Sequence, residues 1–190
     1  GVHRILSTVD RPSPFADRRE LNRDFAMGSS AVIYLVRHSK AGERRVWQGE
    51  DVDRPLSKTG WKQSQAVARR LSKKKVSSLY ASPYVRCMQT LEPLGALVGL
   101  PVQAEQRLFE DEPFEPVLDL INEVKDGAVL CSHGDIIPAV INALVRRGME
   151  VETPPDWGKA SVWVLRRKGD RITRGKVWPP PVLAAKSAKK

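Results

Sequence analysis

The stretch "AVIYLVRHSKAG", residues 31–42, decides the fold that we expect for this 190-residue chain. Residues 31–36 are all hydrophobic and include several β-branched side chains, a pattern that favours a strand buried on both faces. Arg37 and His38 then follow side by side. A buried strand gains nothing from a cation next to an imidazole, whereas a ligand site at the end of the strand would use both. The stretch therefore predicts a buried strand with a functional site at its carboxyl end.

The composition is that of a globular domain. Hydrophobic residues make up 41% and charged residues 28% of the chain, which excludes a disordered class. The sequence has no hydrophobic run of about 18 residues, which a membrane-spanning helix would need, and its N-terminal segment lacks the apolar core of a secretory signal. Cys87 and Cys131 are too few for a disulfide framework, so we expect a cytoplasmic protein.

The chain is strongly basic. Lysine and arginine outnumber aspartate and glutamate by 32 − 22 = 10. Such a balance suits an anionic partner, namely a phosphorylated compound, nucleic acid or a membrane surface, and it also serves solubility alone. Charge by itself therefore selects none of these partners.

Strand patterns alternate with helix patterns along the chain, which predicts an α/β fold. We expect a three-layer, doubly wound, mostly parallel sheet with helices on both faces and a C-terminal hairpin. Strands are predicted at 31–37, 76–82, 100–105 and 127–132, helices at 57–74, 83–99, 115–124 and 135–148, and the hairpin at 160–178 around Lys168-Gly169-Asp170.

Local features set the expected ends of the helices. Ser57 or Thr59 is the expected N-cap of the helix at 57–74, and Pro83 suits the first turn of the helix at 83–99. Pro93 should interrupt or kink that second helix, because proline lacks the N–H group and clashes with the preceding turn.

We expect three segments along the chain. Residues 1–30 are polar, contain proline and are weakly periodic, so we interpret them as a leader or the remnant of an upstream segment. They should be largely extended, with one candidate short helix at 16–26. Residues 31–180 should form the folded domain, and residues 181–190 a basic flexible tail.

Polar side chains gather where the predicted strands end, the edge at which open α/β sheets bind ligands. A single histidine or arginine there is more often structural. Two imidazoles and two guanidiniums, however, would repel one another unless an anion neutralised them. A phosphoryl group is the simplest such anion, because guanidinium groups bind it bidentately and nearby helix N-termini donate N–H groups to it. The residues concerned are Arg37, His38, Ser39 and Lys40 after the first strand, Arg86 in "ASPYVRCMQT", and Ser132, His133 and Gly134 in "CSHGD".

These motifs resemble those of the histidine phosphatase superfamily, also called phosphoglycerate-mutase-like. "VRHSKAG" is similar to the family's Arg-His-Gly motif, with Ser39 in the glycine position. "ASPYVRCMQT" (81–90) is similar to its second arginine motif, "SHGD" (132–135) to its second histidine motif, and "PLSKTGWKQSQAVA" (55–68) to one of its helix starts. The likeness covers about residues 31–165 in the right order and spacing, and it implies a phosphoglycerate-mutase-like fold.

The resemblance also implies covalent catalysis without a metal ion or other cofactor. His38 would be the nucleophile that carries the phosphoryl group as phosphohistidine. His133 would act with it, and the cationic side chains would stabilise the charge on the transferring group. The implied phosphate-binding residues are Arg37, Arg86, His133, Ser39 and Lys40.

The acid that protonates the leaving group has several candidates. The family supplies an acidic residue after the third strand, often in an "L-x-E" context, and "RLFEDE" offers Glu110. Asp111, Glu112 and Glu105 compete with it, and the segment also fits a solvated acidic loop. Some short members of the family have no obvious acid, so the role can also be unfilled.

Two branches of the superfamily are most similar. "RHSKAG" (37–42) resembles the start of SixA-type phosphohistidine phosphatases. "CSHGDIIPA" (131–139) and the C-terminal strands look more like the histidine phosphatase half of mycobacterial MutT-type Nudix proteins, which act on nucleotides, although this chain carries no Nudix box. We therefore expect a metal-independent phosphatase or phosphohydrolase for a small phosphorylated or nucleotide substrate. The alternative is a SixA-like protein phosphohistidine phosphatase.

Other functions fit less well. Mutases of the family carry longer insertions around the acid than the segment from Thr90 to Asp119 allows. A non-catalytic basic module would leave the paired histidines and arginines unexplained, so we expect neither nucleic acid nor a membrane as partner. Trp47 lies with Arg44 and Arg45 in the loop after the first strand, where it could stack on a base or pack on the domain.

Overall fold

The structure is a computed structural model that describes residues 29–184. The expected leader, its candidate helix at 16–26 and most of the basic tail lie outside the described residues. Among the described residues, no helix is both long and apolar enough to cross a membrane.

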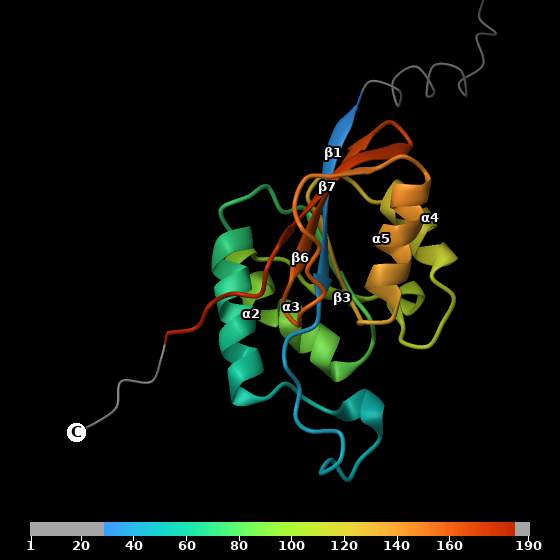
Figure 1. Ribbon diagram of the computed structural model, residues 1–190. Helices are drawn as coiled ribbons and strands as arrows, with labels where there is room; N and C mark the ends of the chain where they lie inside the picture. The colour runs from blue at the N-terminus through green and yellow to red at the C-terminus, as the bar shows by residue number, and fades with distance from the viewer. Residues whose placement is uncertain (1–28, 185–190) are drawn as a thin grey trace, which may run out of the picture.

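A seven-stranded sheet forms the middle layer, with strand order β3-β2-β4-β1-β6-β7-β5 (Figure 1). β6 pairs antiparallel with both of its neighbours, β1 and β7, whereas the other pairs of adjacent strands are parallel. The strands are β1 (Ser30–Arg37), β2 (Ser78–Ala81), β3 (Val102–Ala104), β4 (Ala128–Ser132), β5 (Glu150–Val151), β6 (Val162–Lys168) and β7 (Arg171–Trp178).

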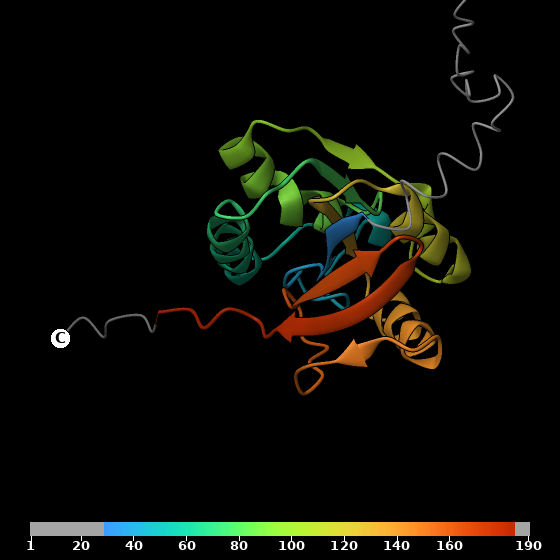
Figure 2. The ribbon, with the colours of Figure 1, turned by 90° about the horizontal axis from the view of Figure 1, so that it is seen from above.

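Helices cover both faces of the sheet, with α2 and α3 on one side and α4 and α5 on the other (Figure 2). The expectation of a three-layer, mostly parallel sheet is confirmed. The helices are α2 (Lys58–Leu71), α3 (Val85–Val98), α4 (Glu115–Glu123) and α5 (Ile136–Arg146), with two short 3-10 helices, η1 (Asp51–Asp53) and η2 (Gln106–Leu108).

The hydrophobic run of β1 is explained by this double cover. Ile33 and Leu35 face the α4/α5 side, whereas Tyr34 and Val36 face the α2/α3 side. All four are at most 5% exposed. Since full burial of such a side chain contributes about 1.5–3 kcal/mol, a polar residue anywhere in this run would be costly. β1 is therefore a central strand.

The predicted helices are present, with two corrections. Pro83 lies two residues before the first residue of α3 and not in its first turn. The Ser57 hydroxyl accepts a hydrogen bond from the N–H of Gly60 at 3.1 Å, so Ser57 is the N-cap of α2. Pro93, in contrast, does not interrupt α3, which continues through it to Val98. Leu91 and Leu94, on either side of the proline, are buried in the α2/α3 core, so tertiary packing holds the helix where its local preference would break it.

The C-terminal hairpin is also present, as β6 and β7 joined at Gly169 and Asp170. Gly169 has a φ of 61°, a conformation that glycine adopts without strain. β5, η1 and η2 were not predicted, because elements of two or three residues are too short to show a periodic pattern.

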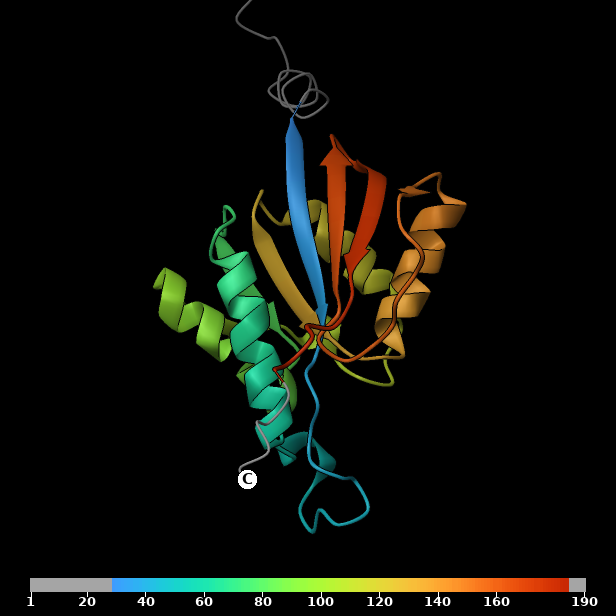
Figure 3. The ribbon, with the colours of Figure 1, turned by 60° about the vertical axis from the view of Figure 1, so that its left-hand side comes forward.

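Three strand ends converge at one edge of the sheet. In the parallel pairing, Arg37 at the end of β1 lies opposite Ser132 of β4, and Ala81 of β2 lies opposite Cys131. A long loop, residues 42–57, extends beyond this edge from the end of β1 and carries η1 (Figure 3). The residues predicted to form a site therefore leave neighbouring strands side by side.

The N-terminus of α2 fixes the chain just after β1. A Cβ atom on Gly60 would lie 1.9 Å from the carbonyl oxygen of Lys40, and that same oxygen accepts hydrogen bonds from the N–H and the hydroxyl of Ser57. The close approach requires glycine at position 60.

We predict that Gly60→Ala lowers the free energy of unfolding by about 1–3 kcal/mol, measured by urea denaturation, because the new methyl group must displace backbone. Alanine normally stabilises a helix relative to glycine. The sign of the change in the free energy of unfolding therefore tests the prediction. The exposed neighbour Thr59 supplies the control, since Thr59→Ala should change stability by no more than about 0.5 kcal/mol. A more stable Gly60→Ala protein would contradict the packing described here.

Candidate active site

A cavity of about 400 Å³ opens at the edge where β1, β2 and β4 end. Its volume lies in the range of small-molecule sites, about 300–1,000 Å³. It is lined by Arg37, His38, Lys40, Ala41, Gly42, Glu43, Arg44, Arg54, Arg86, Glu110, Gly134, Asp135 and Lys159. Six of these side chains are cationic and three are acidic, so the lining is suited to an anion.

His38 lies in the wall of this cavity and is only 6% exposed. Its Nδ1 is 2.8 Å from the carbonyl oxygen of Ser39. A carbonyl only accepts hydrogen bonds, so Nδ1 carries the proton and Nε2 keeps its lone pair. Burial, followed by the positive charges of Arg86 and Arg37, lowers the pKa of His38 to about 3, although the bond to Ser39 acts in the opposite direction. The ring is therefore neutral at physiological pH.

Arg37 lies beside His38, with its guanidinium against the backbone of Gly134. A Cβ atom on Gly134 would come within 2.6 Å of the Arg37 Nη2 atom. The Arg37 Nη1 atom donates to the carbonyl of Trp157, whereas its buried Nε has no hydrogen-bond partner in the part of the chain that the structure describes. The glycine of the "SHGD" motif thus leaves the space in which this guanidinium lies.

Arg86 projects from the first turn of α3 and is 1% exposed. Its Nη1 donates to the backbone carbonyl of Asp51 at 3.0 Å, and its Nη2 lies 3.2 Å from the Asp51 carboxylate and 2.8 Å from that of Glu110. The guanidinium also lies over the ring of Tyr84, 4.4 Å from its centroid. These contacts fix a buried cation on the cavity wall.

His133 follows β4 and is fully buried. Its Nε2 is 2.8 Å from the hydroxyl of Ser82, and its ring meets that of His38 edge to face at 5.4 Å between centroids. Burial, then the nearby charges of His38 and Arg86, lowers its pKa to about 3. Its Nδ1 has no hydrogen-bond partner among residues 29–184, although a Glu110 carboxylate oxygen lies 3.9 Å away. His133 is not among the residues that line the cavity, so the structure places this expected site residue against His38 within the protein and not on the cavity surface.

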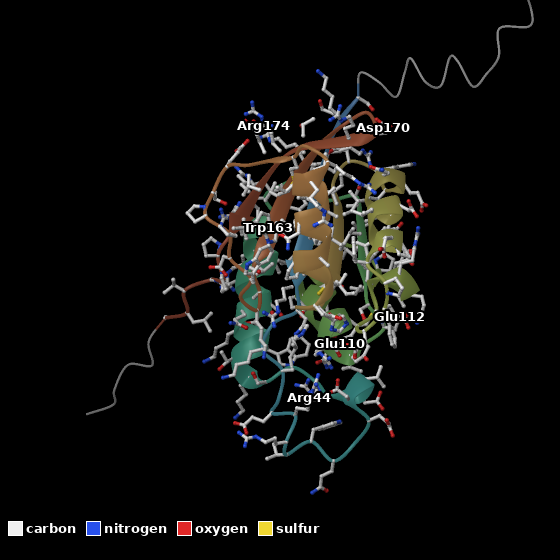
Figure 4. The ribbon with its side chains drawn as sticks, turned by 45° about the vertical axis from the view of Figure 1, so that its right-hand side comes forward. Arg44, Glu110, Glu112, Trp163, Asp170 and Arg174 are labelled. Carbon is white, nitrogen blue, oxygen red and sulfur yellow. The ribbon has the colours of Figure 1, made fainter. Side chains whose placement is uncertain are left out.

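Glu110 is the predicted acid that the structure places in the cavity. Besides Arg86, it lies 3.7 Å from Arg44, and Figure 4 shows these two side chains at the same end of the molecule. Glu105 instead pairs with Arg107 at 3.0 Å and does not line the cavity. Asp111 and Glu112 are exposed residues that also lie outside the lining.

Of the two other expected phosphate ligands, the structure brings only Lys40 into the cavity. The Ser39 hydroxyl is fully buried, shares a hydrogen bond with Ser64 at 2.8 Å and does not line the cavity. The N–H of Ser39 is occupied by the hydroxyl of Thr90 at 3.0 Å. The structure thus does not bring the expected ligand Ser39 into the cavity, because its side chain turns toward α2 and bonds to Ser64.

Four residues of the site were missed by sequence reasoning. Asp51 lies within 3.5 Å of Arg44, Arg54 and Arg86 and so ties the loop after β1 to α3. Asp135 lines the cavity and accepts a hydrogen bond from the N–H of Asp111. The other two are the cations Arg54 and Lys159. The only sequence signal was the concentration of charged residues in these loops, which solvated loops also show.

Trp47 does not line the cavity. Its indole N–H donates to the carbonyl of Glu50 at 2.8 Å, and its ring packs against Gly49, where a Cβ atom would approach it to 3.1 Å. Trp47 is 38% exposed. These contacts lie within the loop itself, and not with the body of the domain on which Trp47 was expected to pack.

Residues 29–184 contain no group of three or more His, Cys, Asp and Glu side chains that could hold a metal ion. The cavity instead presents guanidinium and ammonium groups. These can hold an oxyanion by charge-assisted hydrogen bonds.

A family model described as the histidine phosphatase superfamily (branch 1) matches residues 33–112. The matched segment contains Arg37, His38, Arg86 and Glu110. This segment of the chain is therefore similar to the histidine phosphatase superfamily. The resemblance found in the sequence is thereby confirmed.

Among curated relatives, this chain is 28% identical over 176 residues to the 8-oxo-(d)GTP phosphatase of Mycolicibacterium smegmatis. The match covers 88% of this chain and 54% of the relative, so the chain spans about half of that protein's length.

Solved structures agree on the fold. A SixA-type protein from Nakamurella multipartitia superposes with a TM-score of 0.62 at 21% identity, over 82% of this chain and 99% of that one. The protein histidine phosphatase SixA complexed with tungstate gives a TM-score of 0.59 at 22% identity, over 70% of this chain and 86% of that one. The phosphoglycerate-mutase-like fold expected from the sequence is confirmed.

We predict that Gly134→Ala weakens the binding of inorganic phosphate by about tenfold, since the added methyl group displaces the Arg37 guanidinium and a hydrogen bond to a charged group is lost. Isothermal titration calorimetry measures the change. Gly42→Ala is the matched control in the same cavity, because its Cβ atom would meet only the Pro55 carbonyl, at 3.9 Å. Equal affinities for the two variants would show that Arg37 is not held by this contact.

Proposed function

We propose that this protein hydrolyses a phosphate ester or phosphoanhydride through a phosphohistidine on His38. The observation that carries the proposal is the hydrogen bond from His38 Nδ1 to the Ser39 carbonyl, which leaves Nε2 unprotonated in the wall of a cationic cavity. A neutral imidazole nitrogen with a free lone pair is the nucleophile that this chemistry needs.

The reaction has two steps with Nε2 as the atom that changes bonds. In the first, Nε2 forms a bond to phosphorus as the bond from phosphorus to the leaving oxygen breaks. Glu110 gives its proton to that oxygen, so it must leave its ion pairs with Arg86 and Arg44 and be protonated when the ester binds. In the second, water attacks phosphorus, the N–P bond breaks, and Glu110 takes the proton from the water. Inorganic phosphate leaves, and His38 returns to its neutral form.

Arg37, Arg86 and His133 act on the phosphoryl oxygens. Arg86 is fixed by Asp51 and Glu110 before any ligand arrives, and Arg37 is fixed by Trp157 and Gly134. Donors that are held in place need little rearrangement as charge shifts during transfer, which lowers the barrier most when water is excluded. The cationic side chains thus supply the charge that a metal ion supplies in other phosphatases.

We propose a nucleotide as the substrate class. The relative from Mycolicibacterium smegmatis is named for 8-oxo-(d)GTP, and a structural neighbour carries tungstate, an oxyanion of phosphate-like shape. In this chain, the cavity volume of about 400 Å³ supports the proposal, since it leaves room beyond a single phosphoryl group.

We predict that His38→Ala abolishes turnover of p-nitrophenyl phosphate while leaving the fold intact, because no other neutral side chain of the cavity presents a nucleophilic nitrogen. The wild-type protein, quenched after mixing with labelled substrate, should carry phosphate that is labile in acid and stable in base. Arg45→Ala, at an exposed position outside the cavity lining, is the control and should keep full activity. A fully active His38→Ala protein would refute the mechanism.

We predict that Glu110→Gln slows the hydrolysis of an alkyl phosphate far more than that of p-nitrophenyl phosphate. An alkoxide leaves poorly without a proton, and general acid catalysis is typically worth about 10²–10⁴-fold. The measurement is kcat/KM for both substrates, with Glu112→Gln as the control outside the cavity. A uniform loss would mean that Glu110 only positions the loop. No loss at all would favour a substrate that needs no acid, such as a phosphoanhydride or phosphohistidine.

A further inference from the structure

The loop before β6 is pinned against the end of β1. The N–H of Ala160 donates to the carbonyl of Arg37 at 3.1 Å, and the N–H of Arg37 donates to the carbonyl of Ser161 at 3.1 Å. Trp157, at the start of the loop, accepts from the Arg37 guanidinium and stacks on Trp163 at 5.2 Å. This segment, residues 157–161, is therefore held in register with the catalytic strand.

The same loop stores backbone strain at one position. Ala160 is buried and has a φ of 67°, which is unfavourable for any residue other than glycine. Such a conformation persists only where its surroundings fix it, and it is most common at functional sites. The residue that this turn presents to the cavity is Lys159, its immediate neighbour.

Lys159 faces other cations without an acidic partner. Its pKa is lowered by partial desolvation of the ammonium group and then by the positive charges of Arg37, Arg54 and Lys40. Within the described residues, no carboxylate forms an ion pair with Lys159 or Lys40. By contrast, Arg86 and Arg44 of the same cavity already have carboxylate partners. The two lysines are therefore free to bind an anion.

The depth of these side chains separates two subsites. His38 and Arg86 are buried, whereas Lys40 and Lys159 are exposed at the rim. A phosphoryl group bound at His38 already meets Arg37 and Arg86, which line the same cavity. The group that leads out of the cavity is the leaving group, so unpaired cations at the rim meet whatever is attached to the transferred phosphoryl.

We propose that Lys159, with Lys40, forms a subsite for a second phosphate, so that the substrate ends in a diphosphate. This inference rests on the proposed function, because it takes His38 as the nucleophile for the terminal phosphoryl group. Arg54 also lines the cavity, but it is buried and already paired with the Asp51 carboxylate.

Transfer of the terminal phosphoryl group from a diphosphate forms one bond and breaks one bond. His38 Nε2 bonds to the terminal phosphorus, the bond to the bridging oxygen breaks, and that oxygen leaves with its electron pair on the second phosphate. The negative charge that develops there lies next to Lys159. An ammonium group can stabilise it directly, so this leaving group needs less help from an acid than an alkoxide does.

The test compares the binding of two phosphonates that the protein cannot hydrolyse. Methylenebisphosphonate carries two adjacent phosphonates, and methylphosphonate carries one. Isothermal titration calorimetry on the full chain should show methylenebisphosphonate binding at least about tenfold more tightly, as expected for added contacts to charged groups. Lys159→Met should remove most of this preference, and Lys159→Arg should retain it.

Lys168→Met is the matched control. Lys168 is an exposed lysine at the hairpin end of β6. Because β6 runs antiparallel to β1 and Lys168 pairs with Ser30, this position lies at the opposite edge of the sheet from the cavity. Figure 4 shows Asp170, of the same hairpin turn, at the opposite end of the molecule from Arg44 and Glu110. This variant should bind both phosphonates as the wild type does. Phosphonoacetate, which replaces one phosphonate by a carboxylate, tests whether any second anion suffices.

Three outcomes would overturn the subsite: no preference for methylenebisphosphonate in the wild type, an equal loss of both phosphonates in Lys159→Met, or phosphonoacetate binding as tightly as methylenebisphosphonate. Binding of these ligands does not depend on turnover. A protein that prefers the bisphosphonate but does not form phosphohistidine would refute the proposed function and leave the subsite standing. A protein that hydrolyses monoesters but does not prefer the bisphosphonate would refute the subsite and leave the proposed function standing.

Discussion

The parallel pairing of β1 with β4 is the constraint on which the rest of the site depends. It sets Arg37 opposite Ser132, so the two residues that follow, His38 and His133, leave neighbouring strands at the same edge and reach 5.4 Å between ring centroids. The pairing is held because β1 is buried on both faces, and a shift of register by one residue would turn its hydrophobic side chains to the wrong sides. Core packing and site geometry are therefore specified by the same strand.

The cavity concentrates positive charge, and its acidic residues control how that charge is distributed. Asp51 and Glu110 hold Arg44, Arg54 and Arg86 by ion pairs. Arg37, Lys40 and Lys159 have no such partner among the described residues. This asymmetry is consistent with a phosphoryl group that binds between prepositioned guanidiniums at depth and a leaving group that is met by free ammonium groups at the rim. Burial keeps both histidines neutral in this cationic setting, with each pKa lowered to about 3.

Residues at strand ends were predictable because two local patterns coincided there. A continuous hydrophobic run identified β1 and β4, and the polar residue types that follow such runs identified Arg37, His38 and His133. Arg86 followed from its position in the first turn after a strand. Ser39 failed this reasoning, since the turn after β1 directs its hydroxyl toward Ser64 and away from the cavity. Pro93 failed for a related reason, because burial of Leu91 and Leu94 outweighs the local cost of proline within a helix.

The sequence by itself determined the layered α/β fold, the strand ends at which the cavity opens, and the histidines and arginines that meet there. Periodicity and residue type are local properties, so they can be recognised without knowledge of the rest of the chain. Only the tertiary structure decided the tautomer of His38, the position of Glu110 and not Glu105 in the cavity, and the contacts of Asp51, Arg54 and Lys159. These depend on contacts between segments far apart in the chain, such as residues 157–161 against the end of β1, and the direction of a loop side chain is set by those contacts and not by its neighbours in sequence.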